Sequence, residues 1–225
     1  MKILQTNFHG DHNLGLFGKS SDKFCLVGNF VQEKVKQKIE EVLKVKTVRT
    51  TASNTDLVGV FCSFNSNGIL LPKILTRTET ENFNKLKKEF GVNIEVLKSK
   101  FTAVGNLVLC NDKGAVVSKL LSKASKKRIE DCLGVEAEYC SVAGMDVVGS
   151  SGVASNKGCI VHRDTSEGEV KKIGEILKVQ TDIGTANFGS PFVGSCCFAN
   201  SSGVAIGESS TGPEINRIIE VLELF

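Results

Sequence analysis

The sequence predicts an α/β fold, a closed fivefold pseudosymmetric α/β propeller, and three observations carry this prediction. A glycine pattern recurs about every 45 residues along the whole chain. Each copy contains, in order, two apolar strand-like runs, an amphipathic helix and an alternating strand. The last copy lacks its final strand, whereas one strand is left over at the N-terminus. Closing the five strand-strand-helix-strand units into a ring accounts for both ends.

The glycine pattern is a Val-Gly pair followed nine positions later by a second glycine. The first glycines of four copies lie 46, 44 and 45 residues apart, and Leu14-Gly15 extends the series toward the N-terminus. The repeats therefore start near residues 15, 59, 105, 149 and 194. Because a ring of repeats shares one core, we expect residues 1–225 to form a single domain. The four copies are Val58-Gly59 with Gly68, Val104-Gly105 with Gly114, Val148-Gly149 with Gly158, and Val193-Gly194 with Gly203.

A strand hairpin is predicted at each pair of glycines. The first strand follows the first glycine, as in residues 106–110 and 195–199, and the second follows the second glycine, as in residues 69–71. Unbroken apolar runs bounded by glycine are typical of strands buried on both faces. The residues between the two runs are turn formers such as Asn65-Ser66-Asn67. We therefore expect the second glycines to have a positive φ.

An amphipathic helix is predicted after each hairpin. Apolar residues recur at helical spacing, as in Val31, Val35 and Ile39. The third helix, around residues 128–133 and ended by Gly134, has the least distinct pattern. Three of the other helices begin with Ser/Thr-x-x-Glu capping boxes, in which the hydroxyl accepts from a free amide and the Glu reaches back. These boxes are Thr78 with Glu81, Ser166 with Glu169, and Thr211 with Glu214.

An alternating strand follows each of the first four helices, as in residues 92–96, 135–139 and 179–183. The chain ends after the fifth helix, so the fifth unit has no third strand of its own. Residues 2–6 precede Gly15 by about the distance at which the other alternating strands precede their glycines. We therefore expect the N-terminal strand to complete the last repeat.

Composition indicates a soluble, cytoplasmic protein. Hydrophobic residues make up 41% of the chain, enough for a sizeable core, and we expect neither a signal peptide nor a membrane-spanning segment. None of the eight cysteines forms a Cys-x-x-Cys pair, which favours reduced, buried thiols over disulfides or a metal site. The sequence contains no phosphate-binding loop or dinucleotide fingerprint. We expect no cofactor and no metal.

Three segments resemble the translation initiation factor 6 family, a ribosome anti-association family, in its archaeal form. They are residues 101–112 (FTAVGNLVLCND), residues 148–158 (VGSSGVASNKG) and residues 187–190 (NFGS). The similarity extends over all five units and is much more specific than the glycine pattern. It implies a pentein-like ring and a translation factor that is not an enzyme.

The resemblance also implies a partner. Members of this family bind the large ribosomal subunit near the ribosomal protein corresponding to bacterial L14 and the sarcin-ricin loop of rRNA. Binding there prevents premature association with the small subunit, and an additional part in large-subunit biogenesis is left open. We expect a monomer that binds neither DNA nor membranes.

The residue after each first glycine is the predicted ribosome-binding position. Pseudosymmetry should gather these residues around one face, and their chemistry varies while the preceding glycine is constant. The alternative is that they merely begin strands. The family resemblance is strongest at Asn106, because the matching Asn of the family lies on the surface that meets the ribosomal protein. The five residues are Leu16, Val60, Asn106, Ser150 and Ser195.

A basic stretch is the second candidate surface. From Lys85 to Arg128 there are eleven basic residues against three acidic ones, and such a patch attracts a phosphate backbone. Solvated lysine-rich helices produce the same pattern. The chain has one Tyr and no Trp to stack on bases. Any contact with RNA is therefore expected through charge and shape rather than base reading.

Two other classes of protein remain as alternatives. Pentein-type rings also house amidino-group-modifying enzymes, for which Cys196 or Cys197 would be the nucleophile, with His162 as acid-base and Asp164 or Asp146 as the orienting carboxylate. Both cysteines lie in an apolar run, and no second carboxylate pair would hold a guanidinium, so the enzyme is disfavoured. A clamp around a nucleic-acid duplex is also disfavoured, because apolar central strands leave only a narrow channel.

Overall fold

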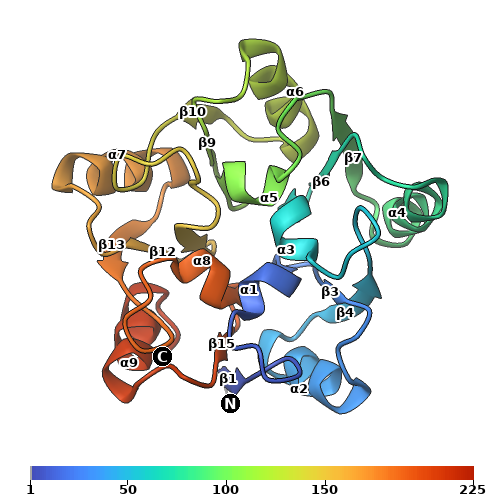
Figure 1. Cartoon of the computed structure of the whole chain (residues 1–225). Coiled ribbons are helices and arrows are strands. Elements are labelled where there is room, and N and C mark those ends of the chain that lie inside the picture. The colour runs from blue at the N-terminus through green and yellow to red at the C-terminus, as the bar shows by residue number, and fades with distance from the viewer. Residues whose placement is uncertain (1) are drawn as a thin grey trace.

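The computed structural model describes residues 2–225 as five units around a common centre, each a three-stranded sheet with a helix on its outer side (Figure 1). Met1, which belongs to the predicted domain, lies outside the described residues. No helix within residues 2–225 is long and apolar enough to cross a membrane. The first unit contains β2 (Gly18–Ser20), β3 (Phe24–Gly28), α2 (Glu33–Leu43) and β4 (Lys46–Thr50).

The later units repeat this order of elements. The second contains β5 (Ser63–Phe64), β6 (Gly68–Pro72), α4 (Arg77–Phe90) and β7 (Asn93–Leu97). The third contains β8 (Val108–Cys110), β9 (Ala115–Val117), α6 (Lys123–Leu133) and β10 (Ala137–Tyr139). The fourth contains β11 (Gly152–Ala154), β12 (Gly158–His162), α7 (Glu167–Leu177) and β13 (Gln180–Gly184). The fifth contains β14 (Cys197–Ala199), β15 (Val204–Gly207) and α9 (Gly212–Val221).

The N-terminal strand β1 (Ile3–Thr6) supplies the third strand of the fifth sheet. It pairs in parallel with β15, with Leu4 opposite Ala205. In every sheet the first two strands form an antiparallel hairpin and the third is parallel to the second, as a helical crossover requires. Every residue of the five middle strands is buried. The predicted repeat order and the predicted place of the N-terminal strand are confirmed.

Five short turns at the first glycines differ from the prediction. We expected strands to begin directly after these glycines, but four of the glycines lie in one-turn helices and Gly149 lies in a turn over residues 148–150. The strands start later, at Val108 rather than Asn106 in the third unit. The reason is that each helical turn redirects the chain onto the sheet. The four short helices are α1 (Leu14–Phe17), α3 (Val58–Phe61), α5 (Val104–Leu107) and α8 (Val193–Cys196).

The first glycines pack against one another from unit to unit. A Cβ built on Gly59 would lie under 3.0 Å from the carbonyl oxygen of Gly15, and one on Gly105 would meet that of Gly59 in the same way. The same holds for Gly149 against Gly105 and for Gly194 against Gly149. The series returns to its start, because Gly15 meets the carbonyl oxygen of Gly194. Close approach of backbones therefore requires glycine at all five positions.

The second glycines were predicted to have a positive φ, and that prediction is wrong. None of Gly68, Gly114, Gly158 and Gly203 has one. Close packing is again the reason for the glycine. A Cβ on Gly114 would meet the carbonyl oxygen of Ile176 in the next unit's helix, and one on Gly158 would meet that of Val221.

The helix starts follow the predicted capping pattern with one correction. Ser166 with Glu169 and Thr211 with Glu214 are capping boxes as predicted. In the second unit, however, the box is Thr76 with Glu79 rather than Thr78 with Glu81, because α4 begins one residue after Thr76. The third helix is longer than its apolar pattern indicated: it begins after the N-cap Ser122 and ends at Gly134, which has φ 66°.

The core is shared between neighbouring units. Each buried cluster combines the helix of one unit with inner-strand residues of the unit before it, so no unit buries its apolar surface alone. Polar groups link the units as well: the Asn65 Nδ2 donates to the carbonyl oxygens of Asn111 and Leu133, at 3.1 and 2.9 Å. Strand residues that enter the next unit's cluster are Phe198 beside α2, Phe24 beside α4, Leu70 beside α6, Leu109 beside α7 and Val153 beside α9.

The glycine packing leads to a prediction for Gly105→Ala. The new Cβ would lie under 3.0 Å from three backbone carbonyl oxygens, of Gly59, Val60 and Cys62, which cannot move aside independently. We expect the free energy of unfolding to fall by about 3 kcal/mol in chemical denaturation. Gly168→Ala on α7 is the matched control, because a Cβ at this position meets nothing within 4 Å. This substitution should leave the stability unchanged or raise it by up to about 1 kcal/mol. Equal stabilities for the two variants would contradict the packing argument.

Candidate functional site

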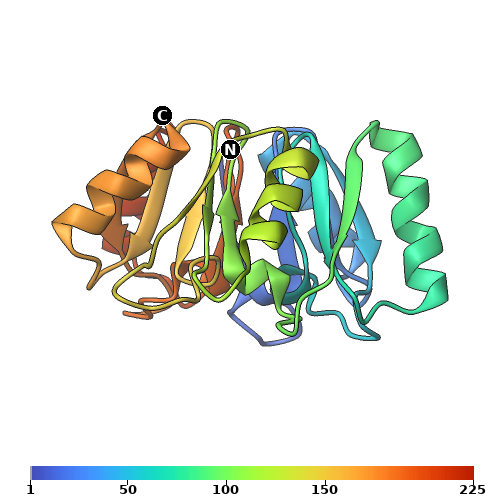
Figure 2. The same ribbon diagram turned by 90° about the horizontal axis from the view of Figure 1, so that it is seen from above.

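The first-glycine turns form one surface of the ring, here named the turn face: helices α1, α3, α5 and α8 and the turn over residues 148–150. The four helices surround the centre in Figure 1 and lie on the side away from the termini in Figure 2. The hairpin turns lie at the other end of the inner strands and form the hairpin face. Because α1 contacts both α3 and α8, and α3 contacts α5, the turn face is continuous.

All five sequence-predicted residues lie at equivalent places on the turn face. Each follows a first glycine within a short helix or turn, and each is half-buried. Local hydrogen bonds hold their backbones: the amide of Leu16 donates to Asn13 O at 3.1 Å and that of Val60 to Leu57 O at 3.0 Å. The residues concerned are Leu16, Val60, Asn106, Ser150 and Ser195.

Asn106 offers the largest set of hydrogen-bonding groups among the five side chains. Its carbonyl oxygen accepts from Gly149 N at 2.9 Å, and its own amide N–H donates to Ala103 O at 3.0 Å, so its backbone is fully used. Within residues 2–225 the side-chain amide makes no hydrogen bond to the protein. By contrast, the Ser150 hydroxyl donates to Val147 O at 3.1 Å. An amide fixed in place with free donors and acceptors is suited to a hydrogen bond with a partner.

The loops that precede the turns are held by carboxylates, a feature that sequence reasoning missed. The capping-box Glu of a unit also accepts from the loop backbone: Glu79 from Asn54 N at 2.8 Å, Glu169 from Gly144 N at 3.0 Å and Glu214 from Gly189 N at 2.8 Å. These bonds fix tight loops that contain left-handed residues such as Asn54 and Ala143. The capping motif was visible in the sequence, but its second role depends on the fold.

The same hydrogen bonds keep these carboxylates ionised. Burial raises the pKa of Glu79, but hydrogen bonds from the backbone and from hydroxyl groups outweigh it, and the pKa is lowered overall. The pKa values of Glu169 and Glu214 are lowered by the same balance. The loops of the turn face are therefore tied down by charged acceptors, which make the stronger kind of hydrogen bond.

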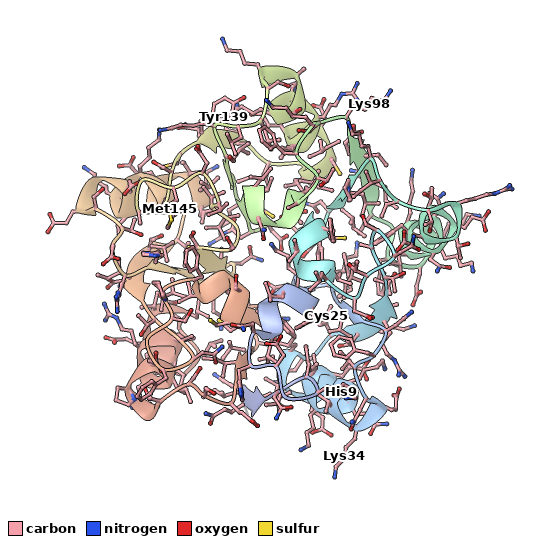
Figure 3. All side chains as sticks on the ribbon, viewed as in Figure 1. His9, Cys25, Lys34, Lys98, Tyr139 and Met145 are labelled. Carbon is pink, nitrogen blue, oxygen red and sulfur yellow. The ribbon has the colours of Figure 1, made fainter. Side chains whose placement is uncertain are left out.

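The basic stretch is spread over α4, α6 and the connections between them. Part of its charge is neutralised, because Lys126 pairs with Glu130 and Arg128 with Glu95. Lys98 and Lys100 differ in position: they follow β7 in the connection that leads to α5, and Lys98 lies toward the outer rim (Figure 3). The Lys100 Nζ lies 5.0 Å from the centroid of the Phe101 ring. These two lysines therefore put positive charge beside the turn face.

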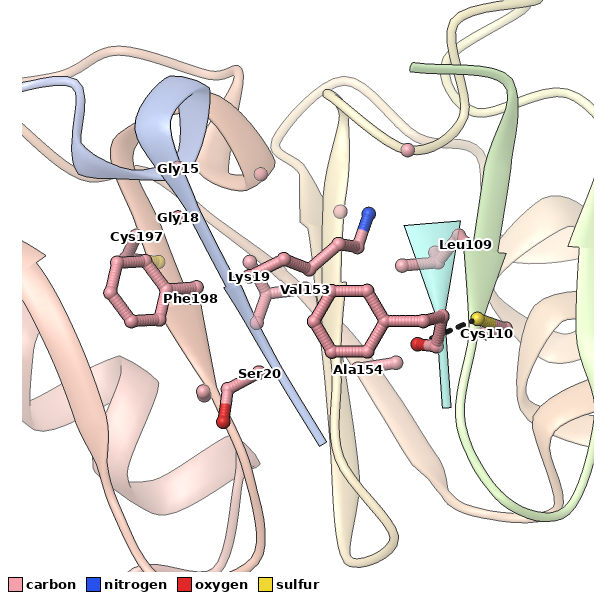
Figure 4. A pocket seen from close by; sticks show the side chains of 15 residues that line it. Gly15, Gly18, Lys19, Ser20, Leu109, Cys110, Val153, Ala154, Cys197 and Phe198 are labelled. Carbon is pink, nitrogen blue, oxygen red and sulfur yellow. Dashed lines mark hydrogen bonds between the residues drawn. The ribbon is translucent and has the colours of Figure 1, made fainter. Parts of the chain in front are cut away.

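A narrow central cavity of about 30 Å³ lies along the axis. All five units line it, through residues such as Gly18, Phe64, Leu109, Val153 and Phe198. Lys19 extends into this apolar space (Figure 4), where its Nζ lies 3.5 Å from Gly105 O. Burial lowers the pKa of Lys19, and the Cys110 and Cys62 thiols offset this only in part.

The residues of the enzyme alternative do not form a reactive centre. Cys196 and Cys197 are buried, and burial raises the pKa of both thiols, which opposes the thiolate a nucleophile needs. The buried His162 accepts from Asp164 N at 3.1 Å through Nδ1, and its ring packs edge-on against Phe192. Asp146 lies in the loop before the fourth turn. All eight cysteines are free and buried, and within residues 2–225 no cluster of three or more metal-ligating side chains is formed.

Comparison with known proteins gives a consistent result along the chain. A model of the eIF-6 family matches residues 3–221. A protein named translation initiation factor 6 from Pyrococcus abyssi is 42% identical over 226 residues, which cover 100% of both chains. Proteins of the same name from Methanococcus vannielii and Staphylothermus marinus are 41% and 37% identical. These alignments cover 99% and 97% of this chain and 99% and 96% of the relatives.

The position of Lys19 leads to a prediction for Lys19→Met. Methionine keeps the apolar stem but removes a partly buried ammonium, so the free energy of unfolding at pH 7 should rise. The folded-state pKa of Lys19 is lowered, so the parent gains stability as the pH rises toward the ordinary value of 10.5, and the variant should lack this gain. Denaturation curves across this pH range test it, with Lys157→Met on an exposed hairpin turn as control. A less stable Lys19→Met protein at pH 7 would contradict the prediction.

Proposed function

The chain belongs to the eIF-6 family, and from that premise we propose that it binds the large ribosomal subunit through the turn face and prevents premature association with the small subunit. The repetition of one half-buried position at all five turns supports this proposal most. Backbones fixed by glycine packing make a rigid surface, and rigid surfaces lose little entropy on binding. The proposed contact residues are Leu16, Val60, Asn106, Ser150 and Ser195.

Two components of the large subunit are the proposed partners. The ribosomal protein that corresponds to bacterial L14 meets the centre of the turn face, where Val60 offers apolar surface and Asn106 a free amide. The sarcin-ricin loop of rRNA meets the side of the face beside Lys98 and Lys100, whose charge suits a phosphate backbone. In this arrangement the bound factor covers a surface that the small subunit needs.

We also propose that the protein is a monomer without catalytic activity that acts in the cytoplasm, and that it folds as one domain, a closed pentein propeller. A part in large-subunit biogenesis would need no activity other than binding to the large subunit. The parallel pairing of β1 with β15 supports closure, as does the packing of Gly15 against Gly194. The shared cores support a single domain, because each cluster draws on two units. The raised pKa values of the Cys196 and Cys197 thiols support a role without covalent catalysis.

Charge placed on the turn face tests the proposed function. Asn106→Arg and Val60→Glu should each weaken binding to purified large subunits by about 2 kcal/mol, because central contact residues dominate such interfaces. Cosedimentation measures the affinity, and subunit joining in the presence of each variant measures the consequence. Lys157→Glu, an exposed change on the hairpin face, should bind like the parent.

Thermal unfolding must show that the two variants fold, since both positions are half-buried. Parent affinity in folded Asn106→Arg and Val60→Glu proteins would place the contact elsewhere on the ring. In that case the basic stretch from Lys85 to Arg128 would be the next surface to change.

A further inference from the structure

We propose that Phe188, in the loop that leads to α8 of the turn face, is an anchor that inserts into an apolar pocket, rimmed by basic groups, on a protein component of the large subunit. This inference rests on the proposed function. Phe188 lies in the loop between β13 and α8, and 83% of its surface is exposed. Only the C-terminal Phe225, at 81%, is similarly open among the large hydrophobic residues described. A single exposed apolar side chain is common on protein surfaces, so the case for Phe188 rests on its exposure together with its backbone conformation and its place beside the turn face.

The backbone of Phe188 is in an unfavourable conformation. Its φ is 62°, in the left-handed region that bulky residues rarely adopt, and the preceding Asn187 has a φ of 51°. Glycine would relieve the strain at no cost to packing, because the Phe188 side chain makes little contact with the protein. Equivalent loops of other units contain left-handed residues as well, at Ser53-Asn54 and Ala143-Gly144, so the loop conformation belongs to the repeat. What is particular to this unit is that a bulky phenylalanine occupies the position, at the expense of stability.

Hydrogen bonds hold the strained loop in one position. Phe188 N and Gly189 N both donate to the Glu214 carboxylate, at 3.2 and 2.8 Å. The Asn187 Nδ2 donates to His12 O at 2.7 Å, across to the first unit, and Asn187 N donates to Ser210 Oγ at 2.9 Å. The ring is therefore carried on a fixed support next to α1, and little entropy is lost when it is buried in a partner.

The charges around the loop favour a protein over RNA as the occupant. Glu214 lies directly behind Phe188, and the His12 to which Asn187 bonds lies beside Glu208, 3.7 Å from its carboxylate. Asp11 accepts from Asn13 N at 2.8 Å in the same region. Three carboxylates would repel a phosphate backbone but attract a basic rim. Aromatic residues, Phe among them, are enriched at protein-protein interfaces, and a few residues that fill pockets dominate the affinity of such interfaces.

Substitutions of Phe188 test this inference by cosedimentation with purified large subunits. Phe188→Ala should weaken binding at least tenfold with an unchanged melting temperature, whereas Phe188→Leu should keep most of the affinity, because an apolar pocket accepts an aliphatic side chain. Phe225→Ala is the matched control for loss of an exposed ring and should bind like the parent.

Three outcomes would overturn the inference. Parent affinity for Phe188→Ala shows that the ring is no anchor. Equal losses for the Ala and Leu variants indicate that the ring stacks on a base, since stacking needs an aromatic face. If the parent protein itself does not cosediment with large subunits, the proposed function is wrong, and this inference is wrong with it. That result is seen with the parent protein alone, so it is distinguishable from a failure of the Phe188 inference.

Discussion

The structure depends on one steric constraint: each first glycine lies so close to the carbonyl oxygen of the preceding first glycine that no side chain fits between them. The contact links five units into a series that returns from Gly194 to Gly15. The second glycines impose the same constraint at the other end of the inner strands, against the helix of the next unit. Both sets remove side chains where backbones meet, and the apolar strand residues fill the remaining space between units.

This constraint also explains how the proposed binding surface arises from a repeat. Packing requires glycine at the first-glycine positions but does not restrict the residue that follows. Leu16, Val60 and Asn106 can therefore have different side chains although they occupy equivalent backbone positions. The loops before the turns gain rigidity from charged acceptors such as Glu214, which bind helix and loop at once. Rigid backbones and variable side chains are the combination that specific recognition needs. In this account the same contacts stabilise the fold and position the proposed ribosome-binding residues.

Sequence patterns predicted the repeat and missed the contacts between repeats. Glycine spacing, capping boxes and the spare strand before Gly15 are local signals, and they predicted the element order and the partner of β1. The reason for Gly114 could not be read locally: turn-forming neighbours suggested a positive φ, but the contact is with Ile176 in another unit. Thr78 with Glu81 fits the capping motif as well as Thr76 with Glu79 does, but α4 begins directly after Thr76, and Glu79 also accepts from Asn54 N in the neighbouring loop. Residues 187–190 contributed to the family resemblance, but nothing in their sequence indicated that the Phe188 side chain is exposed.

The central claim is that the turn face, rather than the hairpin face, meets the large subunit. A photoreactive amino acid can be placed at positions 60, 106 and 150 on the turn face and at the exposed positions 67, 113 and 157 on the hairpin face. Each protein is then irradiated in complex with purified large subunits. The account predicts crosslinks to ribosomal components from the first three positions and none from the last three. Crosslinks from the hairpin positions alone would contradict it.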